Sequence, residues 1–302
     1  MRVIVVGLGV QGVKRKKVAG HECVATVEIR DGEGDYSSIE TVPLDIFDGA
    51  ILCLPDDQKL TSIKYLISKR KHIMVEKPLA FGNRDLIKDV FDEARQAGVI
   101  LYTAYNHRFE PAFVRMKKLI ESGELGNIYS VRMFYGNGTA RLVRDSEWRD
   151  NGSGVLSDLG SHLLDTINFW FSDFRDDLSL IIENNFENKV SDHAVLLSTK
   201  LRPQINLEMT LCMWRNHFTC DVLAENGSAH IESLCKWGPS TFTKRKRVFP
   251  SGIPDEEQIT LVQGDPTWEL EYTEFKRLID SHIILDHMRD LWIDDTLNCL
   301  KK

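Results

Sequence analysis

Apolar residues in the first 105 positions are concentrated in short runs. The runs occupy residues 3–6, 23–29, 49–55, 72–76 and 99–105. Such runs are typical of strands that are buried on both faces. Apolar residues at helical spacing in residues 56–71 predict a helix, and residues 83–98 predict another. Strands that alternate with helices predict a parallel sheet with right-handed crossovers.

The second half of the chain has a different pattern. Turn residues separate five strand-like runs, at residues 178–185, 191–200, 204–214, 217–233 and 240–249. Few helices lie between them, so an antiparallel sheet is expected. Asn226-Gly227 is a hairpin signal within the fourth run. Residues 157–171 predict a helix with Asp158, His162 and Asp165 on one face.

Composition narrows the class of protein. The 302 residues include 42% hydrophobic and 27% charged residues, which is ordinary for a globular protein. A net charge of −7 argues against a nucleic-acid binder. No apolar run is long enough to span a bilayer, and six scattered cysteines without a C-x-x-C pair read as reduced thiols. We therefore expect a cytoplasmic protein without a membrane segment or a metal site.

A glycine turn follows the first apolar run. Gly7-Leu8-Gly9-Val10-Gln11-Gly12 has the spacing of a dinucleotide-binding turn, in which Gly7 allows the turn and Gly9 the approach of a pyrophosphate. Gly12 lets the next helix pack closely, and the helix N-terminus attracts the phosphates.

An acidic residue stands where a ribose-binding carboxylate is expected. Glu28 ends the second run and favours NAD, while Arg30 leaves NADP as the alternative. The basic run at residues 14–17 is interpreted as a solvated helix face. Residues 29–48 leave little room for a further strand and helix, so the adenine side of the site is expected to be reduced.

Charged and proline residues follow two of the predicted strands. Pro55 ends the third run, and Glu76-Lys77-Pro78 follows the fourth. Ligands of parallel sheets collect at the carboxyl ends of strands. Lys77 there has two interpretations: it holds a substrate hydroxyl, or it forms a loop ion pair with Glu76.

Four ordered motifs carry a resemblance to a known family. The glycine turn, Glu76-Lys77-Pro78, residues 105–111 ("YNHRFEP") and residues 152–165 ("GSGVLSDLGSHLLD") occur in sequence. The chain resembles the Gfo/Idh/MocA family of sugar and nucleotide-sugar dehydrogenases. The resemblance implies an α/β fold: an N-terminal Rossmann domain, residues 1–107, and an α+β domain with a large open antiparallel sheet, residues 108–302. The last helices are expected to pack back on the Rossmann domain.

The resemblance also implies site residues. Lys77, Asp158 and His162 correspond to the family's catalytic lysine, aspartate and histidine. The histidine common soon after Pro55 in relatives is absent here.

The resulting hypothesis is reversible oxidation of a secondary hydroxyl on a sugar or nucleotide sugar. His162 moves the proton, Lys77 stabilises the oxygen, and Asp158 orients His162. The other expected contacts are Glu76 with the cofactor, Asn106 and Arg108 with substrate, and Trp148 and Arg149 with the cofactor.

Two alternatives remain open at this point. One is a non-catalytic NAD(P)-sensing protein on the same scaffold, and the other is a reductase of a non-sugar substrate such as an imine or a linear tetrapyrrole. A homodimer or homotetramer through the C-terminal sheet is expected, because an apolar sheet face needs cover.

Overall fold

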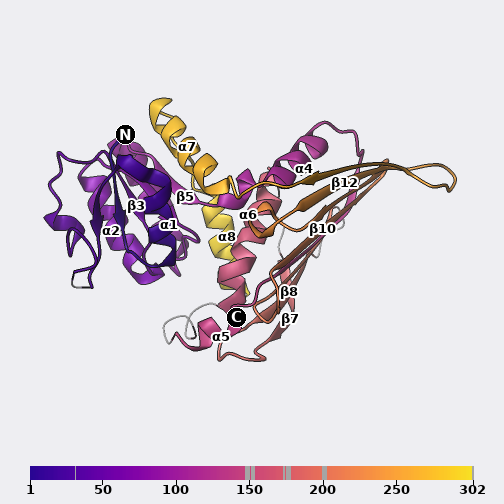
Figure 1. Cartoon of the computed structure of the whole chain (residues 1–302), viewed down its shortest axis with the longest axis horizontal. Helices are drawn as coiled ribbons and strands as arrows, with labels where there is room; N and C mark the ends of the chain where they lie inside the picture. Colours follow the sequence, from indigo (N-terminus) through magenta and orange to yellow (C-terminus); the bar gives the residue numbers. More distant parts are fainter. Residues whose placement is uncertain are drawn as a thin grey trace. The chain divides into compact units, whose positions relative to one another are not determined.

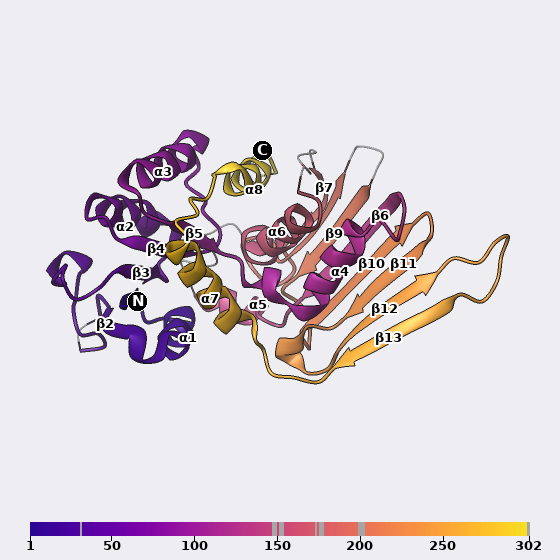
Figure 2. The same ribbon diagram turned by 90° about the horizontal axis from the view of Figure 1, so that it is seen from above.

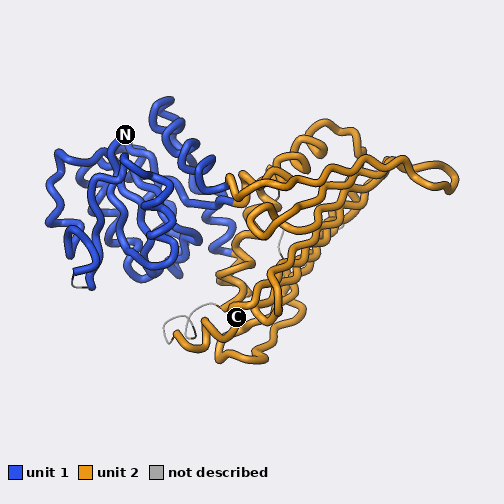
Figure 3. The backbone as a smooth tube through the Cα atoms, in the orientation of Figure 1, with its two compact units in different colours: residues 1–106, 267–295 blue, residues 107–266, 296–302 orange. Residues whose placement is uncertain are grey.

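The structure is a computed structural model that describes residues 1–300 apart from 31, 147–149, 151–153, 173, 175–177 and 199–202 (Figure 1). The chain forms two compact units (Figure 3). The first comprises Met1–Asn106 and Thr267–Asp295, and the second comprises His107–Pro266 and Thr296–Lys302. No helix among the described residues has the length and apolar character needed to cross a membrane.

The first unit contains a five-stranded parallel sheet in the order β2-β1-β3-β4-β5. Its strands are β1 (Val3–Val6), β2 (Cys23–Val27), β3 (Gly49–Leu52), β4 (His72–Glu76) and β5 (Leu101–Ala104). Its helices are α1 (Val10–Ala19), α2 (Asp56–Ser68), α3 (Arg84–Ala97) and α7 (Thr267–Asp280), and α8 (Met288–Cys299) starts in this unit. Asn83 caps α3 and Gly98 closes it in a left-handed conformation, as predicted.

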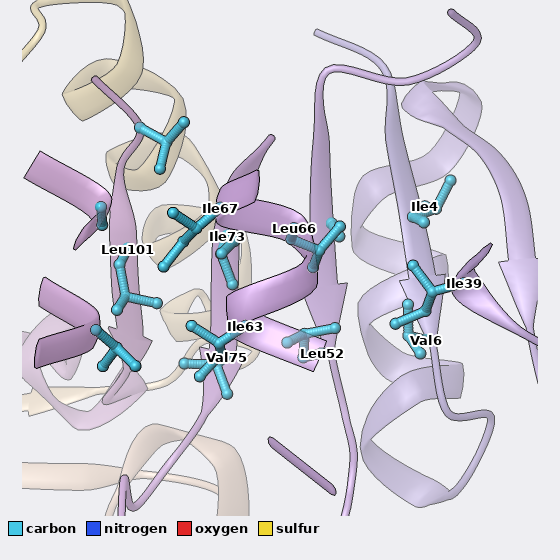
Figure 4. Close-up of a cluster of buried hydrophobic side chains, with 14 of the residues drawn as sticks. Ile4, Val6, Ile39, Leu52, Ile63, Leu66, Ile67, Ile73, Val75 and Leu101 are labelled. Carbon is cyan, nitrogen blue, oxygen red and sulfur yellow. The ribbon is translucent and has the colours of Figure 1, made fainter. Parts of the chain in front are cut away.

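Helices cover both faces of this sheet. Alternate strand residues such as Ile4, Leu52 and Val75 pack with Ile63 and Leu66 of α2 (Figure 4). The intervening residues, Val5 and Met74 among them, pack with Phe275 of α7 on the other face. Because both faces are buried, the strands read as unbroken apolar runs in the sequence. The predicted Rossmann arrangement is confirmed.

The second unit contains an eight-stranded sheet in the order β13-β12-β11-β10-β6-β9-β8-β7 (Figure 2). The strands are β6 (Ile128–Gly136), β7 (Leu178–Asn184), β8 (His193–Ser198), β9 (Gln204–Thr210), β10 (His217–Ala224), β11 (Gly227–Glu232), β12 (Ser240–Lys246) and β13 (Asp255–Leu261). Asn226 and Gly227 stand at the β10–β11 hairpin, as predicted. All pairs are antiparallel except β6 with β9, which is parallel.

Two helices lie along one face of this sheet, α4 (Pro111–Glu121) and α6 (Ser161–Trp170) (Figure 2). The short helix α5 (Ala140–Arg144) follows β6. A π-helical turn, Leu156–Gly160, leads directly into α6. The predicted helix is therefore present, but the π turn changes the register between Asp158 and His162 from a plain i, i+4 relation.

Candidate functional site

The glycine turn joins β1 to α1 in the first unit. Gly7 has φ +86°, and a Cβ there would lie 2.5 Å from the carbonyl oxygen of Cys53. A Cβ on Gly12 would lie 1.8 Å from the Gly7 carbonyl oxygen, so only glycine lets α1 approach this turn. A Cβ on Gly9 would meet nothing within 4 Å, which leaves open space beside the backbone at the start of α1.

Glu28 follows β2 beside this turn. Its side chain is 8% exposed, and Oε2 accepts a hydrogen bond from the Leu8 backbone N–H at 2.7 Å. Oε2 also accepts from Nη2 of Arg30 at 3.0 Å. The hydrogen bond from Arg30, together with the bond from Leu8, lowers the pKa of Glu28 to about 2. The carboxylate is thus ionised at neutral pH.

These residues fit a dinucleotide. Helix α1 has no acidic residue in its first turn and no side-chain cap on its N-terminus. The first-turn N–H groups, at Val10, Gln11 and Gly12, have no partner within the helix, so they suit a pyrophosphate. An ionised carboxylate at Glu28 suits ribose hydroxyls. Among the described residues of 29–48, the structure has one 3-10 turn, Ile39–Thr41, and a single bridge of Tyr36 with Val27. No further full strand and helix occur among them, as expected for so short a segment.

Glu76 and Lys77 stand at the carboxyl end of β4. Glu76 accepts a hydrogen bond from Nε of Arg15 at 2.7 Å, and Nη1 of Arg15 lies 2.7 Å from Oε2 of Glu271 in α7. Arg15 is 1% exposed and its guanidinium lies 4.3 Å from the ring centre of Trp268. The interpretation of residues 14–17 as a solvated face is therefore wrong for Arg15. Its stripe with Gly12 and Ala19 at i, i+3, i+7 was the signal for burial.

Lys77 is half-buried, and the Lys77-Pro78 peptide bond is cis. The carbonyl oxygen of Pro78 accepts a hydrogen bond from Nζ of Lys59 at 2.9 Å. Lys59 is 2% exposed, and its Nζ lies 2.7 Å from Asp56. Burial lowers the pKa of Lys59 despite Asp56. Our sequence reasoning missed Lys59, although it lies at i, i+4, i+8 with Ile63 and Ile67 on the buried stripe of α2.

In the second unit, His162 lies in the first turn of α6 and Asp158 in the π turn before it. Both side chains are half-buried. The ring of His162 stacks on that of His107, with centroids 3.9 Å apart and planes at 16°. Nζ of Lys236 lies 3.1 Å from Nε2 of His107 and 3.1 Å from Oη of Tyr135. Sequence reasoning missed His107, Tyr135 and Lys236, which come from three separate parts of the chain.

The other sequence-predicted residues have defined surroundings. Nε of Arg108 donates to Asp165 Oδ2 at 2.9 Å, and Asp165 is buried, so this pair joins residues 105–111 to α6. The Asn106 amide donates to the Thr267 hydroxyl at 2.8 Å within the first unit. Pro55 precedes α2 at the end of the β3 segment. Trp148 and Arg149 lie outside the described residues.

Two family models match most of the chain. Residues 4–105 match the model described as an oxidoreductase family with an NAD-binding Rossmann fold. Residues 113–230 match the GFO/IDH/MocA C-terminal domain. The two matches fall on the first and second units, respectively.

Curated relatives align over parts of their length. Glucose-6-phosphate 3-dehydrogenase of Bacillus subtilis is 31% identical over 139 residues, which cover 43% of this chain and 39% of the relative. Trans-1,2-dihydrobenzene-1,2-diol dehydrogenase of Oryctolagus cuniculus is 24% identical over 210 residues, which cover 68% of this chain and 63% of the relative. In both cases the match spans less than two thirds of the relative.

Solved structures have the same fold. A levoglucosan dehydrogenase in complex with NADH aligns with a TM-score of 0.82 at 17% identity, covering 98% of this chain and 95% of that chain. UDP-N-acetylglucosamine 3-dehydrogenase of Acidithiobacillus ferrooxidans aligns with a TM-score of 0.80 at 14% identity, covering 100% and 96%. From the two family models and the fold, the chain belongs to the Gfo/Idh/MocA family of NAD-binding oxidoreductases.

Proposed function

We propose that the protein catalyses reversible NAD-dependent oxidation of a secondary hydroxyl on a sugar or nucleotide sugar. The observation that carries this proposal is an ion pair that connects the segment of Lys77 to the helix after the glycine turn. Glu76, which precedes Lys77, is ion-paired at 2.7 Å to Arg15 on the helix that starts at that turn. The oxygen-stabilising Lys77 and the cofactor turn are therefore supported by the same ion pair.

Lys77 supplies a hydrogen-bond donor to the reacting oxygen. Its ammonium group stabilises the negative charge that develops as the hydroxyl loses its proton. Lys59 fixes the turn on the far side by holding the Pro78 carbonyl oxygen. With Arg15 on one side and Lys59 on the other, the backbone of Lys77 is held at both neighbours.

His162 takes the hydroxyl proton in the oxidative direction and returns it in the reductive direction, since an imidazole titrates near neutral pH. Asp158, one turn earlier, orients His162 or a neighbouring substrate hydroxyl. Asn106 and Arg108 are further substrate contacts in this proposal. Arg108 is paired with Asp165, so it would contact the substrate through guanidinium N–H groups that this pair does not use.

Bound NAD supplies the hydride acceptor or donor. Gly9, Val10, Gln11 and Gly12 would hold its pyrophosphate and Glu28 its adenosine ribose, with Pro55 as a further cofactor contact. Trp148 and Arg149 stay sequence-based predictions, because they lie outside the described residues. The names of the relatives support the substrate class, because they include glucose 6-phosphate, inositol, levoglucosan and a UDP-linked sugar.

A substrate panel tests the proposal. Purified protein is incubated with NAD and with glucose 6-phosphate, myo-inositol, levoglucosan or UDP-N-acetylglucosamine, and NADH formation is followed by absorbance. We expect turnover with one sugar class that is lost in His162→Ala. NAD binding by calorimetry without oxidation of any sugar or reduction of any ketosugar would contradict the proposal and favour an NAD-sensing protein.

A further inference from the structure

His162 lies next to a group of residues that has no role in the proposed proton transfer. It joins His107 from residues 105–111, Tyr135 from β6 and Lys236 from the 3-10 turn Cys235–Trp237. All of these residues belong to the second unit, so the cluster is internally defined. His107 is 2% exposed and Tyr135 is 4% exposed.

Glu110 anchors the turn that carries Lys236. Both carboxylate oxygens accept from the Cys235 backbone N–H, at 3.2 and 3.3 Å, and the Cys235 thiol donates to Oε2 at 2.9 Å. Glu110 follows His107 by three residues. The segment that carries His107 is therefore bonded twice to the turn of Lys236, at Glu110 and at His107 itself.

The contact with Lys236 determines which His107 nitrogen carries the proton. An ammonium group has three donors and no acceptor. Nε2 of His107, 3.1 Å from Nζ, must therefore accept, and the ring proton sits on Nδ1. His107 is held as the neutral Nδ1–H tautomer as long as Lys236 is charged.

The neutral ring lies flat against His162. Protonation of His162 would place an imidazolium 3.9 Å, centroid to centroid, from the His107 ring, whose Nε2 lies 3.1 Å from the Lys236 ammonium. Among the described residues no carboxylate lies within ion-pair distance of Nζ of Lys236, so its charge is not cancelled by a direct partner. A like charge at such a distance disfavours the protonated form.

Other charged groups act on His162 as well. Asp158 lies in the π turn directly before α6, and Asp165 is paired with Arg108. Burial raises the pKa of Glu110, whereas the charge of Lys236 acts in the opposite direction. Among the described residues, the charged and titratable groups near these rings include Asp158 and Asp165, His107, Arg108 and Glu110, Tyr135, Asp265, and Lys236 with the thiol of Cys235.

We infer that Lys236 is a positioning residue that, through the neutral His107 ring, keeps His162 unprotonated and ready to accept a proton. This inference rests on the proposed role of His162 as the base. It assigns a task to a residue that touches neither the reacting oxygen nor the cofactor in the proposed mechanism.

Nitrogen-15 NMR of the imidazole rings tests the inference without any substrate. In the unmodified protein at neutral pH, His107 should show a protonated Nδ1 and a bare Nε2. In Lys236→Gln, the protonation midpoint of His162 should rise by about 0.5 to 1 pH unit, because one positive charge near the ring is lost. Lys236→Arg, which keeps the charge, should stay close to the unmodified protein.

Lys117→Met is the matched control. Lys117 is also a half-buried lysine of this unit, and its Nζ donates to the Phe169 carbonyl oxygen at 2.6 Å on the far end of α6. The Lys117→Met substitution removes one positive charge beside the same helix and should leave the protonation midpoint of His162 unchanged. Circular dichroism melting curves check that each variant is folded.

The kinetic arm separates this inference from the proposed function. The acid limb of kcat/KM for sugar oxidation should move to higher pH in Lys236→Gln by the same amount as the His162 midpoint. A protonated Nε2 on His107, or an unchanged His162 midpoint in folded Lys236→Gln, would overturn the inference. If the midpoint rises while the acid limb stays, the inference holds and the role of His162 as the base is contradicted.

Discussion

At the residue scale, two buried carboxyl groups have pKa values shifted in opposite directions because their surroundings differ. Glu28 accepts hydrogen bonds from Arg30 and from the Leu8 N–H, which lower its pKa to about 2. Glu110 is 2% exposed, and burial raises its pKa although the Cys235 N–H and thiol donate to it. The surroundings of Glu28 favour the charged form, whereas burial disfavours it at Glu110.

Glu28→Ala should lower NAD affinity by about 10- to 100-fold, since a hydrogen bond to a charged group contributes roughly 1.5–3 kcal/mol. NADP affinity should change much less, so the preference between the cofactors narrows. Calorimetric titration of both cofactors measures this. Tighter binding of NADP than of NAD by the unmodified protein would contradict the assignment of Glu28 and direct attention to Arg30.

Glu110 should make stability depend on pH. Because its folded-state pKa is raised, its contribution is fully present below the unfolded value near 4.5 and is lost as the pH rises through the folded value. Glu110→Gln keeps an oxygen for the Cys235 N–H and cannot ionise, so this loss should disappear. Urea unfolding at about pH 4 to 8 measures the free energy of unfolding of both proteins. Parallel pH profiles of this free energy would refute the role of Glu110.

At the element scale, Arg15 joins three elements of the first unit: α1, β4 through Glu76, and α7 through Glu271. Glu271 is fully buried, and Glu76 and Glu271 together outweigh the effect of burial and raise the pKa of Arg15. The guanidinium lies 2.7 Å from Oε2 of Glu271.

Arg15→Met should destabilise the protein by about 3–5 kcal/mol, because it removes the guanidinium that is paired with the buried carboxylate of Glu271. Adding Glu271→Leu should recover part of this loss, since the buried carboxylate is then removed as well. Urea unfolding of the single and double variants measures both values. A loss below about 1 kcal/mol in Arg15→Met would show that the pair behaves as an exposed one.

Elements with a strong local pattern were predictable from the sequence. The apolar runs of the first unit, the Asn83 and Gly98 caps and the Asn226-Gly227 turn depend on nearby residues alone. The π turn at Leu156–Gly160 and the exposed strand β13 were not predictable, because no apolar period marks them.

Partners that are far apart in sequence were also missed. Lys236 reaches His107 across 129 positions, and no spacing rule connects the two. Arg15 was misread because charge was given more weight than its position on the buried stripe of α1.

At the scale of the whole molecule, the eight-stranded sheet has one face covered by α4 and α6 (Figure 2). The other face carries half-buried apolar residues such as Phe134, Val195 and Leu197 beside charged ones. We predict a homodimer or homotetramer that buries this face. Light scattering at micromolar concentration should show an oligomer that Val195→Arg with Leu197→Arg dissociates. A monomer in the unmodified protein would refute this prediction.

The central claim is that Lys77 holds the reacting oxygen. Once a substrate has been identified, the kinetics of Lys77→Met test this claim most directly. The control is Lys64→Met, which replaces an exposed lysine of α2. We expect nearly unchanged NAD affinity and a kcat lower by about 100-fold or more, since a lost donor to a developing oxyanion costs about 3 kcal/mol. The double variant with His162→Ala should lose far less than the product of the two losses, because both groups act on one oxygen. Near-normal turnover in Lys77→Met would contradict the claim and leave Lys77 as a loop residue beside Glu76.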